Sequence, residues 1–147
     1  MKKKIGTIIQ LKKIFDPRGN LTVTEEMTDV PFEIRRVYWV YDVPSGECRG
    51  GHAHKKCRTM IVAISGSFHV TLDDGHTKET YLLNHPYQGL LIETGIWRTL
   101  DDFSSGAVCL SLASERFDED DYIRDYEEFL EEVKTRPQPL PCREGSR

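Results

Sequence analysis

Residues 46–54 read Gly-Glu-Cys-Arg-Gly-Gly-His-Ala-His, and no other stretch of the chain constrains its fold and chemistry so closely. His52 and His54 stand two positions apart, so in an extended strand both side chains project from the same face. If that face lines the inside of a barrel, the two imidazoles share one pocket. Imidazole serves both as a metal ligand and as a proton carrier near neutral pH. The stretch therefore predicts a histidine pair with a chemical function.

Short apolar and β-branched runs separated by turn signals surround this stretch, which is typical of an all-β chain. Residues 16–20 (Asp-Pro-Arg-Gly-Asn) indicate a turn, and the continuous apolar run at 60–64 suits a strand covered on both faces. About eight strands at this spacing predict a jelly roll, an antiparallel double-sheet β-barrel. The expected strands are Ile5–Leu11, Leu21–Glu25, Glu33–Tyr41, Arg58–Ser65, Ser67–Asp73, Thr80–Leu83, Gly89–Ile92 and Ala107–Ser114.

The pattern changes near residue 118. From Asp120 to about Thr135 the apolar residues fall three and four positions apart, which predicts an amphipathic helix packed on the outside of a sheet. Residues 136–147 contain three prolines, and we expect them to form a flexible tail. The chain is thus expected to be one domain over residues 1–135, ending in a helix from about residue 120.

The composition excludes several classes of protein. The chain has 147 residues and a formal net charge of -4, whereas nucleic-acid-binding domains usually carry a basic face. No run approaches the roughly 20 apolar residues of a membrane span. Its four cysteines form no Cys-x-x-Cys pair, and no secretory signal is evident. We therefore expect no nucleic-acid partner, no membrane span, and a cytoplasmic protein with thiol cysteines.

The stretch around the histidines resembles the first motif of the cupin family, in which a glycine, five residues and His-x-His precede a glutamate and a later glycine. Gly46 and Gly66 occupy the glycine positions, but Thr59 stands in place of the glutamate. The second cupin motif matches residues 89–98, with Arg98 in place of its histidine ligand. The resemblance implies a cupin jelly roll that carries its C-terminal helix outside the barrel.

The two replaced positions bear on metal binding. A cupin metal site needs neutral imidazoles and a carboxylate around the ion. Threonine is a poor ligand, and arginine is always protonated and repels a divalent cation at short range. A guanidinium instead attracts a phosphate, a carboxylate or a developing oxyanion. We therefore expect no metal and interpret His52 and His54 as acid/base groups.

A longer series of segments is similar to the sugar 3,4-ketoisomerases, cupins that act on dTDP-4-oxo-6-deoxyglucose. The resemblance implies that a ketone moves from C4 to C3 by proton abstraction at C3, an enediol intermediate and reprotonation at C4, without a cofactor. It also implies a homodimer that serves deoxysugar biosynthesis for lipopolysaccharide or S-layer glycans. The similarity runs from about Ile14 to Phe129, and its segments are residues 35–38, 51–55, 72–75, 102–105, 113–114 and 121–126.

The same resemblance assigns roles to individual residues. His54 is the expected base and His52 the group that relays or returns the proton, although the reverse order is open. Tyr38 is expected to contact the sugar or orient a histidine; the alternative is a half-buried strand aromatic. Arg49 is expected to contact the diphosphate, because guanidinium groups fit phosphate geometry. Lys56 is a further expected substrate contact; a solvated lysine is the alternative.

Arg18 and Arg98 complete the expected substrate-binding set. Family members differ at these two positions, and the pocket there is expected to govern the face on which C4 is reprotonated. Arg98 resembles the subgroup that makes the gluco product, towards which we lean, whereas Arg18 resembles the galacto subgroup. Three other functions remain open: a dTDP-sugar 3,5-epimerase-like cupin, a non-catalytic nucleotide-sugar-binding cupin, and a metal-dependent oxygenase or isomerase.

Overall fold

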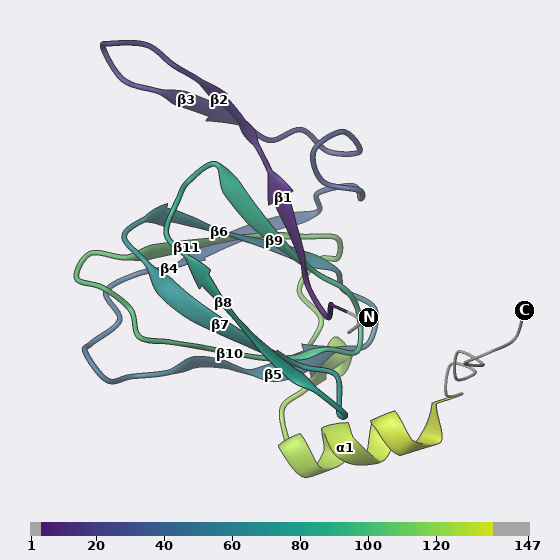
Figure 1. Cartoon of the computed structure of the whole chain (residues 1–147). Helices are drawn as coiled ribbons and strands as arrows, with labels where there is room; N and C mark the ends of the chain where they lie inside the picture. Colours follow the sequence, from purple (N-terminus) through teal and green to yellow (C-terminus); the bar gives the residue numbers. More distant parts are fainter. Residues whose placement is uncertain (1–3, 137–147) are drawn as a thin grey trace, which may run out of the picture.

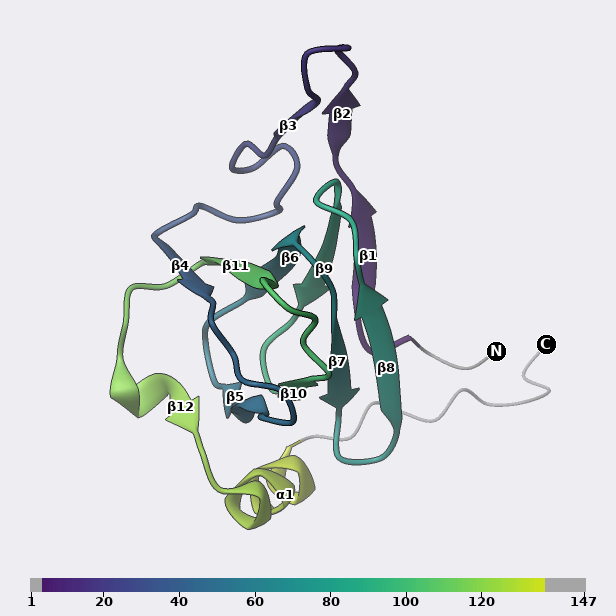
Figure 2. The ribbon, with the colours of Figure 1, turned by 90° about the vertical axis from the view of Figure 1, so that its left-hand side faces the viewer.

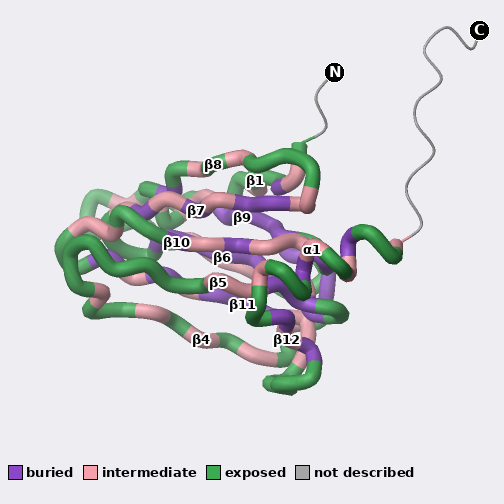
Figure 3. Tube along the Cα trace, turned by 90° about the horizontal axis from the view of Figure 1, so that it is seen from below, coloured by how far each residue is buried: buried purple, intermediate pink, exposed green. Residues whose placement is uncertain are grey.

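The apolar run at 60–64 lies in strand β6 (Thr59–Ser65), whose residues from Thr59 to Ala63 are all buried. Ile61 and Ala63 pack in the core between two sheets, whereas Met60 and Val62 pack on the other face with an outer cluster. The strand is therefore covered on both faces, as predicted from its continuous apolar sequence. Figure 3 shows this concentration of buried residues in the middle strands.

The computed structural model describes residues 4–136, in which two antiparallel five-stranded sheets face each other (Figure 1). In order, the first sheet consists of β1 (Thr7–Gln10), β9 (Gln88–Ile92), β6, β11 (Val108–Ala113) and β4 (Arg36–Val40). The second sheet consists of β12 (Tyr122–Ile123), β5 (Arg49–His54), β10 (Trp97–Asp101), β7 (Phe68–Asp73) and β8 (Lys78–Leu83). This arrangement confirms the predicted all-β jelly roll.

A helix covers part of the outer face of the second sheet (Figure 2). Helix α1 (Tyr126–Thr135) buries Phe129 and Val133 against Ala53 of β5 and Ile123 of β12. Since Ala53 faces this outer cluster, its neighbours His52 and His54 face the barrel interior. Packing of the helix on Ala53 thereby keeps the side chains of His52 and His54 on the inner face of β5.

The predicted helix start was wrong. Residues 119–121 form a short 3₁₀ turn, and Tyr122 and Ile123 then pair as β12 with His54 and Ala53 of β5. The helix begins only at Tyr126, after the N-cap residue Asp125. Tyr122 and Ile123 of β12 happen to lie at positions that continue the three- and four-residue spacing of the apolar residues in α1. Pairing with β5 buries Ile123 completely, which a free helical turn at this point would not do.

Two further segments differ from the expectation. The predicted first strand, Ile5–Leu11, corresponds to β1 alone, and strands β2 (Lys12–Ile14), β10 and β12 were not predicted. Strand β2 pairs with β3 (Leu21–Val23) in a hairpin that projects from the barrel (Figure 1). Apart from Arg136, the predicted tail lies outside the described residues. Among residues 4–136, no helix is long and apolar enough to cross a membrane.

Candidate active site

Two glycines shape the strand that carries the histidines. Gly50 and Gly51 have φ angles of 84° and 73°, in the left-handed region. In the pairing of β5 with β10, Arg98 faces His52 and Thr99 faces Gly50, so Gly51 is the extra residue of a β-bulge. A Cβ atom on Gly50 would lie 3.0 Å from the Arg98 carbonyl oxygen. The Gly-Gly pair ahead of the histidines is therefore a requirement of this backbone.

The histidine rings meet inside the barrel, with centroids 4.9 Å apart and planes at 83°. Both rings are held by the protein: His54 through Nδ1 by an Asp121 carboxylate oxygen at 2.9 Å, and His52 by a hydrogen bond to the backbone of Gly50. The Nε2 atoms of both rings are buried and have no protein partner among the described residues. Two imidazoles therefore present free nitrogen atoms to one space.

Burial lowers the pKa of His52 to about 3 and that of His54 to about 4. The charge of Arg98 is the second cause in both cases, because a nearby cation disfavours protonation. For His54 the carboxylate of Asp121 opposes these effects. Both rings are consequently neutral near pH 7, the state in which an imidazole accepts a proton.

Two arginines face the same space. Arg98, with 2% of its surface exposed, donates from Nη1 to Thr59 Oγ1 at 3.2 Å and from Nη2 to the Ile96 carbonyl at 3.1 Å. Arg36, on β4, has a hydrogen bond to Tyr122. The buried Nε atoms of both arginines lack a partner within residues 4–136. The site therefore combines two free N–H donors with two free imidazole nitrogens, a set that suits an oxygen-rich ligand with developing negative charge.

Aromatic side chains enclose the histidines. The Tyr122 ring lies 5.0 Å from the ring of His52 and 4.4 Å from that of His54. Tyr38, one of the predicted residues, is half-buried on β4, hydrogen-bonds Ser111 and has its pKa raised by burial. Tyr38 thus lies beside Arg36, and its expected contact with the sugar or with a histidine stays a prediction.

The other four predicted residues do not all lie at the site: one is inside it and three are exposed away from the histidines. Arg98 is inside the site. Arg49 is exposed at the start of β5, beside a cavity of about 520 Å³ lined in part by Trp39, Tyr41 and Glu47. Lys56 is exposed, because β5 ends at His54 and the strand alternation does not reach it. Arg18 lies in the projecting hairpin, where its side chain is 90% exposed and pairs with Asp16.

Three site residues escaped prediction: Asp121, Tyr122 and Arg36. Asp121 and Tyr122 lie in the segment that was interpreted as a helix. Asp121 is also 67 residues away from His54 along the chain. Arg36 was included only in the 35–38 segment of the family resemblance, without a role of its own. For Arg36, alternation on β4 with Tyr38 was the one available signal, since both residues must face the same side of the strand.

One group of side chains offers the donor atoms that a metal ion would need. Ligand atoms of His54, Cys57 and Asp121 lie within 4.8 Å of one another and are buried. However, His54 and Asp121 already bond each other directly, and the buried charge of Arg98 is close enough to lower the pKa of His54. A guanidinium beside the cluster disfavours a divalent cation. These residues fit a catalytic metal poorly.

Comparison with known proteins gives a consistent result. The family model described as FdtA, WxcM-like, C-terminal, matches residues 4–134. The TDP-4-oxo-6-deoxy-alpha-D-glucose-3,4-oxoisomerase of Aneurinibacillus thermoaerophilus is 44% identical over 122 residues, 83% of this chain and 88% of that protein.

Solved structures of similar proteins agree. A variant 3,4-ketoisomerase from Thermoanaerobacterium thermosaccharolyticum, in complex with TDP-4-keto-6-deoxyglucose, has a TM-score of 0.89 at 38% identity, covering 92% of this chain and 98% of that one. The TDP-quinovose 3,4-ketoisomerase of Campylobacter jejuni has a TM-score of 0.83 at 43% identity, covering 88% and 99%. The chain therefore belongs to the FdtA-like family of sugar 3,4-ketoisomerases.

Proposed function

We propose that the protein converts dTDP-4-oxo-6-deoxyglucose into a dTDP-3-oxo-6-deoxyhexose in deoxysugar biosynthesis. The observation that carries this proposal is the set of four buried nitrogen atoms without a partner in the described part of the chain, on His52, His54, Arg36 and Arg98. Two of them accept protons and two donate hydrogen bonds to oxygen. Ketone migration between adjacent carbons needs both kinds of group at one place.

The proposed reaction moves two protons. His54 Nε2 takes the proton from C3, the C3–H electron pair forms a C3–C4 double bond, and the carbonyl electrons move to O4. Arg98 donates to the resulting enediolate. His52 passes the O3 proton to O4, and His54, after its proton has exchanged with solvent, protonates C4, leaving the ketone at C3. Protons and electrons balance within the sugar, so the step needs no redox cofactor and no metal.

The remaining site residues serve binding in this proposal. Tyr38 contacts the sugar or holds a histidine, and Arg49 binds the diphosphate from the edge of its cavity. Lys56 is exposed where the chain leaves β5, and there it adds positive charge for the same group. Arg98 also influences the face on which C4 is reprotonated. The thiol state of Cys57 and Cys109 is consistent with work in the cytoplasm.

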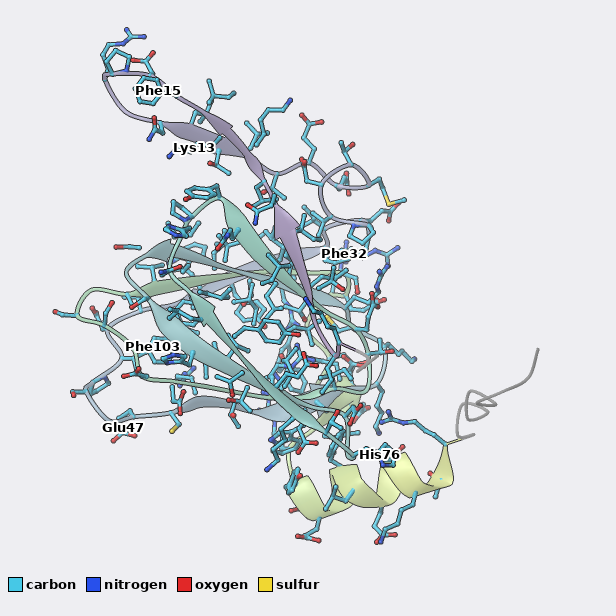
Figure 4. The ribbon with its side chains drawn as sticks, viewed as in Figure 1. Lys13, Phe15, Phe32, Glu47, His76 and Phe103 are labelled. Carbon is cyan, nitrogen blue, oxygen red and sulfur yellow. The ribbon has the colours of Figure 1, made fainter. Side chains whose placement is uncertain are left out.

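A homodimer completes the proposal. The projecting hairpin exposes Phe15, which is 76% exposed (Figure 4), and Leu21, which is 57% exposed. The outer face of the first sheet exposes Val37 and Trp39 on its edge strand β4. Covering both surfaces with a second copy would remove this apolar area from water. It would also give Arg18, which is remote from the histidines of its own chain, a neighbouring subunit to contact. Light scattering on wild type and Phe15→Glu tests this: the variant should be monomeric, and a monomeric wild type would refute it.

The reaction itself is tested by incubating the protein with dTDP-4-oxo-6-deoxyglucose in deuterated water and recording proton NMR spectra. A 3-keto product with deuterium at C4 is expected. Exchange at C5 would indicate a 3,5-epimerase instead, and an unchanged substrate spectrum would refute both activities. A parallel reaction in ordinary water gives the coupling between H4 and H5, which is large for the gluco product and small for the galacto product.

A further inference from the structure

The connection that follows the histidine strand brings a thiol back beside His54. Strand β5 ends at His54, and Cys57, three residues later, is fully buried. Asp121 holds this connection: its backbone carbonyl accepts from the Lys55 N–H at 3.0 Å, and its Oδ1 accepts from the Lys56 N–H at 2.6 Å. These two hydrogen bonds keep the connection, and Cys57 with it, close to the Asp121 carboxylate.

Three different donor atoms meet at this place. One atom each of His54, Cys57 and Asp121 lies within 4.8 Å of the other two, and all three residues are buried. Nδ1 of His54 lies 2.9 Å from Asp121 Oδ2, so this ring nitrogen is on the side of the cluster. Imidazole nitrogen, thiolate sulfur and carboxylate oxygen are the ligands of protein zinc sites. Among residues 4–136 this is the one such group of three, and neither Cys48 nor Cys109 belongs to one.

Only small movements are needed to close a metal site here. Bond lengths of about 2.0–2.3 Å place the ligand atoms of a tetrahedral zinc ion about 3.5 Å apart. Donor atoms within 4.8 Å of one another reach that geometry by side-chain shifts of about 1 Å. The cluster is not the metal site of the cupin pattern, whose ligand positions in this chain are His52, His54, Thr59 and Arg98. The two sites share His54 alone.

Charge decides which metal ions can enter the cluster. Arg98 lies within electrostatic range of Cys57 and Asp121, so it opposes a divalent ion. Because the thiol releases its proton to solvent when it binds a metal, binding adds one positive charge and not two. A thiophilic ion such as Zn²⁺ or Cd²⁺ gains a bond to sulfur that offsets the remaining repulsion. Mg²⁺ prefers oxygen ligands and gains no such bond.

A cavity connects the cluster with the surface. Asp121 lines a space of about 400 Å³ together with Lys56, Phe117 and Asp118, which are all exposed. The lining carries charges of both signs, so the cavity does not itself select for cations. An ion can approach the Asp121 carboxylate from this side, and the selection falls to the three ligands.

We propose that His54, Cys57 and Asp121 form an inhibitory site for thiophilic divalent ions, Zn²⁺ and Cd²⁺. Binding replaces the hydrogen bond between His54 and Asp121 by two bonds to the metal, and the proton on Nδ1 of His54 moves to Nε2. His54 then has no free ring nitrogen for a substrate proton, whichever proton it carries in the reaction. The site is distinct from the proposed function, and its binding is measured without substrate.

Cadmium titration tests the binding. In protein that carries Cys48→Ala and Cys142→Ala, Cd²⁺ should produce the ultraviolet charge-transfer band of a cadmium–thiolate bond, saturating at one ion per chain. Adding Cys57→Ala should abolish the band, because the soft ligand is lost. Cys109→Ala in the same background is the matched control and should keep the band, since burial raises the pKa of the Cys109 thiol to about 12 and keeps it protonated. A band that persists without Cys57, or that disappears without Cys109, would overturn the proposal.

Isomerase assays test the inhibition. Cd²⁺ and Zn²⁺ should inhibit wild type, and a chelator should restore activity, whereas Mg²⁺ at the same concentration should leave kcat within about twofold. Relative to its own metal-free activity, Cys57→Ala should need at least about tenfold more Cd²⁺ for half-inhibition. Equal sensitivity of the two proteins would refute the inhibitory site.

A ¹¹³Cd NMR spectrum keeps the proposal testable even if Cys57→Ala does not fold. In the Cys48→Ala, Cys142→Ala protein, one sulfur ligand should move the resonance downfield of cadmium held by nitrogen and oxygen alone. A resonance without a sulfur ligand would overturn the proposal. Protein that binds Cd²⁺ through Cys57 but isomerises no sugar would refute the proposed function and leave the metal site in place.

Discussion

Replacing Arg98 by methionine separates the chemical contribution of the buried guanidinium from its cost to folding. Methionine has a similar length and no charge, so the change removes the cation and leaves most of the volume filled. In the structure Arg98 is buried, makes two hydrogen bonds, and lies opposite His52 in the sheet. It is also the second cause of the lowered pKa of both histidines. Three measurable effects follow.

The first effect is on the pH profile. Neighbouring strand positions are about 5.5 Å apart, and two charges at that distance interact by about 3 kcal/mol at an effective dielectric of 20. This equals about two pKa units. Removing Arg98 should therefore raise the pKa of His52, its partner in the sheet, by up to about two units from about 3, and should raise the pKa of His54 from about 4 in the same direction. Protonated His54 cannot act as a base, so the acid limb of kcat/KM should move to higher pH.

The second and third effects concern turnover and stability. Loss of a donor to the enediolate should lower kcat about 10²- to 10³-fold at pH 8, where both histidines are neutral in either protein. Exchanging a buried charge for an apolar group of similar size is often neutral or stabilising by about 1–4 kcal/mol. For a chain of this length the Tm should be unchanged or up to about 10 °C higher.

The assay combines pH-dependent kinetics followed by NMR with thermal melts by circular dichroism. Arg58→Met is the control, since Arg58 pairs with Glu93 outside the site and its loss should leave the acid limb in place. A lower Tm for Arg98→Met together with an unmoved acid limb would show that the guanidinium holds the barrel together and does not act on the histidines. That result would refute an electrostatic role of Arg98 in setting the pKa values of His52 and His54.

Four further predictions follow from the same geometry. Tyr38→Phe removes the hydroxyl that bonds Ser111, and kcat should fall about tenfold. The Tm measured by calorimetry should drop only a few degrees, because one hydrogen bond contributes about 1 kcal/mol. An unchanged kcat would show that Tyr38 takes no part in the reaction. His54→Asn should abolish turnover while titration calorimetry still detects dTDP binding; retained turnover would exclude His54 as the base. Ile123→Ala leaves a cavity beneath α1, which should lower the free energy of unfolding in denaturant by about 2–5 kcal/mol and lower kcat by loosening residues 118–123. An unchanged free energy of unfolding would contradict the packing. Because His52 and His54 have folded-state pKa values of about 3 and 4, below the unfolded value of 6.5, the Tm should be highest above pH 6.5 and fall as pH drops from 6.5 towards 4; a flat Tm over that range would contradict the burial of two neutral imidazoles.

The strands that were predicted and those that were missed differ in what their inner faces carry. Strands β6, β7 and β9 place apolar side chains in the core, so their hydrophobic pattern matches their structure. Strand β10 places Arg98 at an inner position and Trp97 beneath the outer helix, and β5 combines two glycines with two histidines. Local patterns are expected to fail where a chain builds a functional site. Of the missed strands, β10 and β12 consequently lie at the site, whereas β2 belongs to the projecting hairpin.

The site divides in a similar way. His52 and His54 could be found because a two-residue spacing on one strand fixes their common direction. Asp121 could not, since its contact with His54 depends on the pairing of the adjacent strand β12 with β5, and no local rule encodes that pairing. The misplaced helix start concealed it further: Tyr122 and Ile123 fit the helical spacing of α1 while belonging to β12. Sequence-distant partners of this kind require the tertiary structure.

The sequence and the structure agree most informatively at Thr59 and Arg98, the two positions where cupin metal ligands are replaced. Thr59 and Arg98 were recognised separately, one as a poor ligand and the other as a fixed cation. In the structure they bond each other, with Arg98 Nη1 donating to Thr59 Oγ1 at 3.2 Å. The hydroxyl therefore orients the guanidinium that disfavours a metal, and the Nε of that guanidinium has no partner among residues 4–136. A cation fixed by the protein in this way can stabilise negative charge on a sugar oxygen without the coordination chemistry that a metal ion would bring.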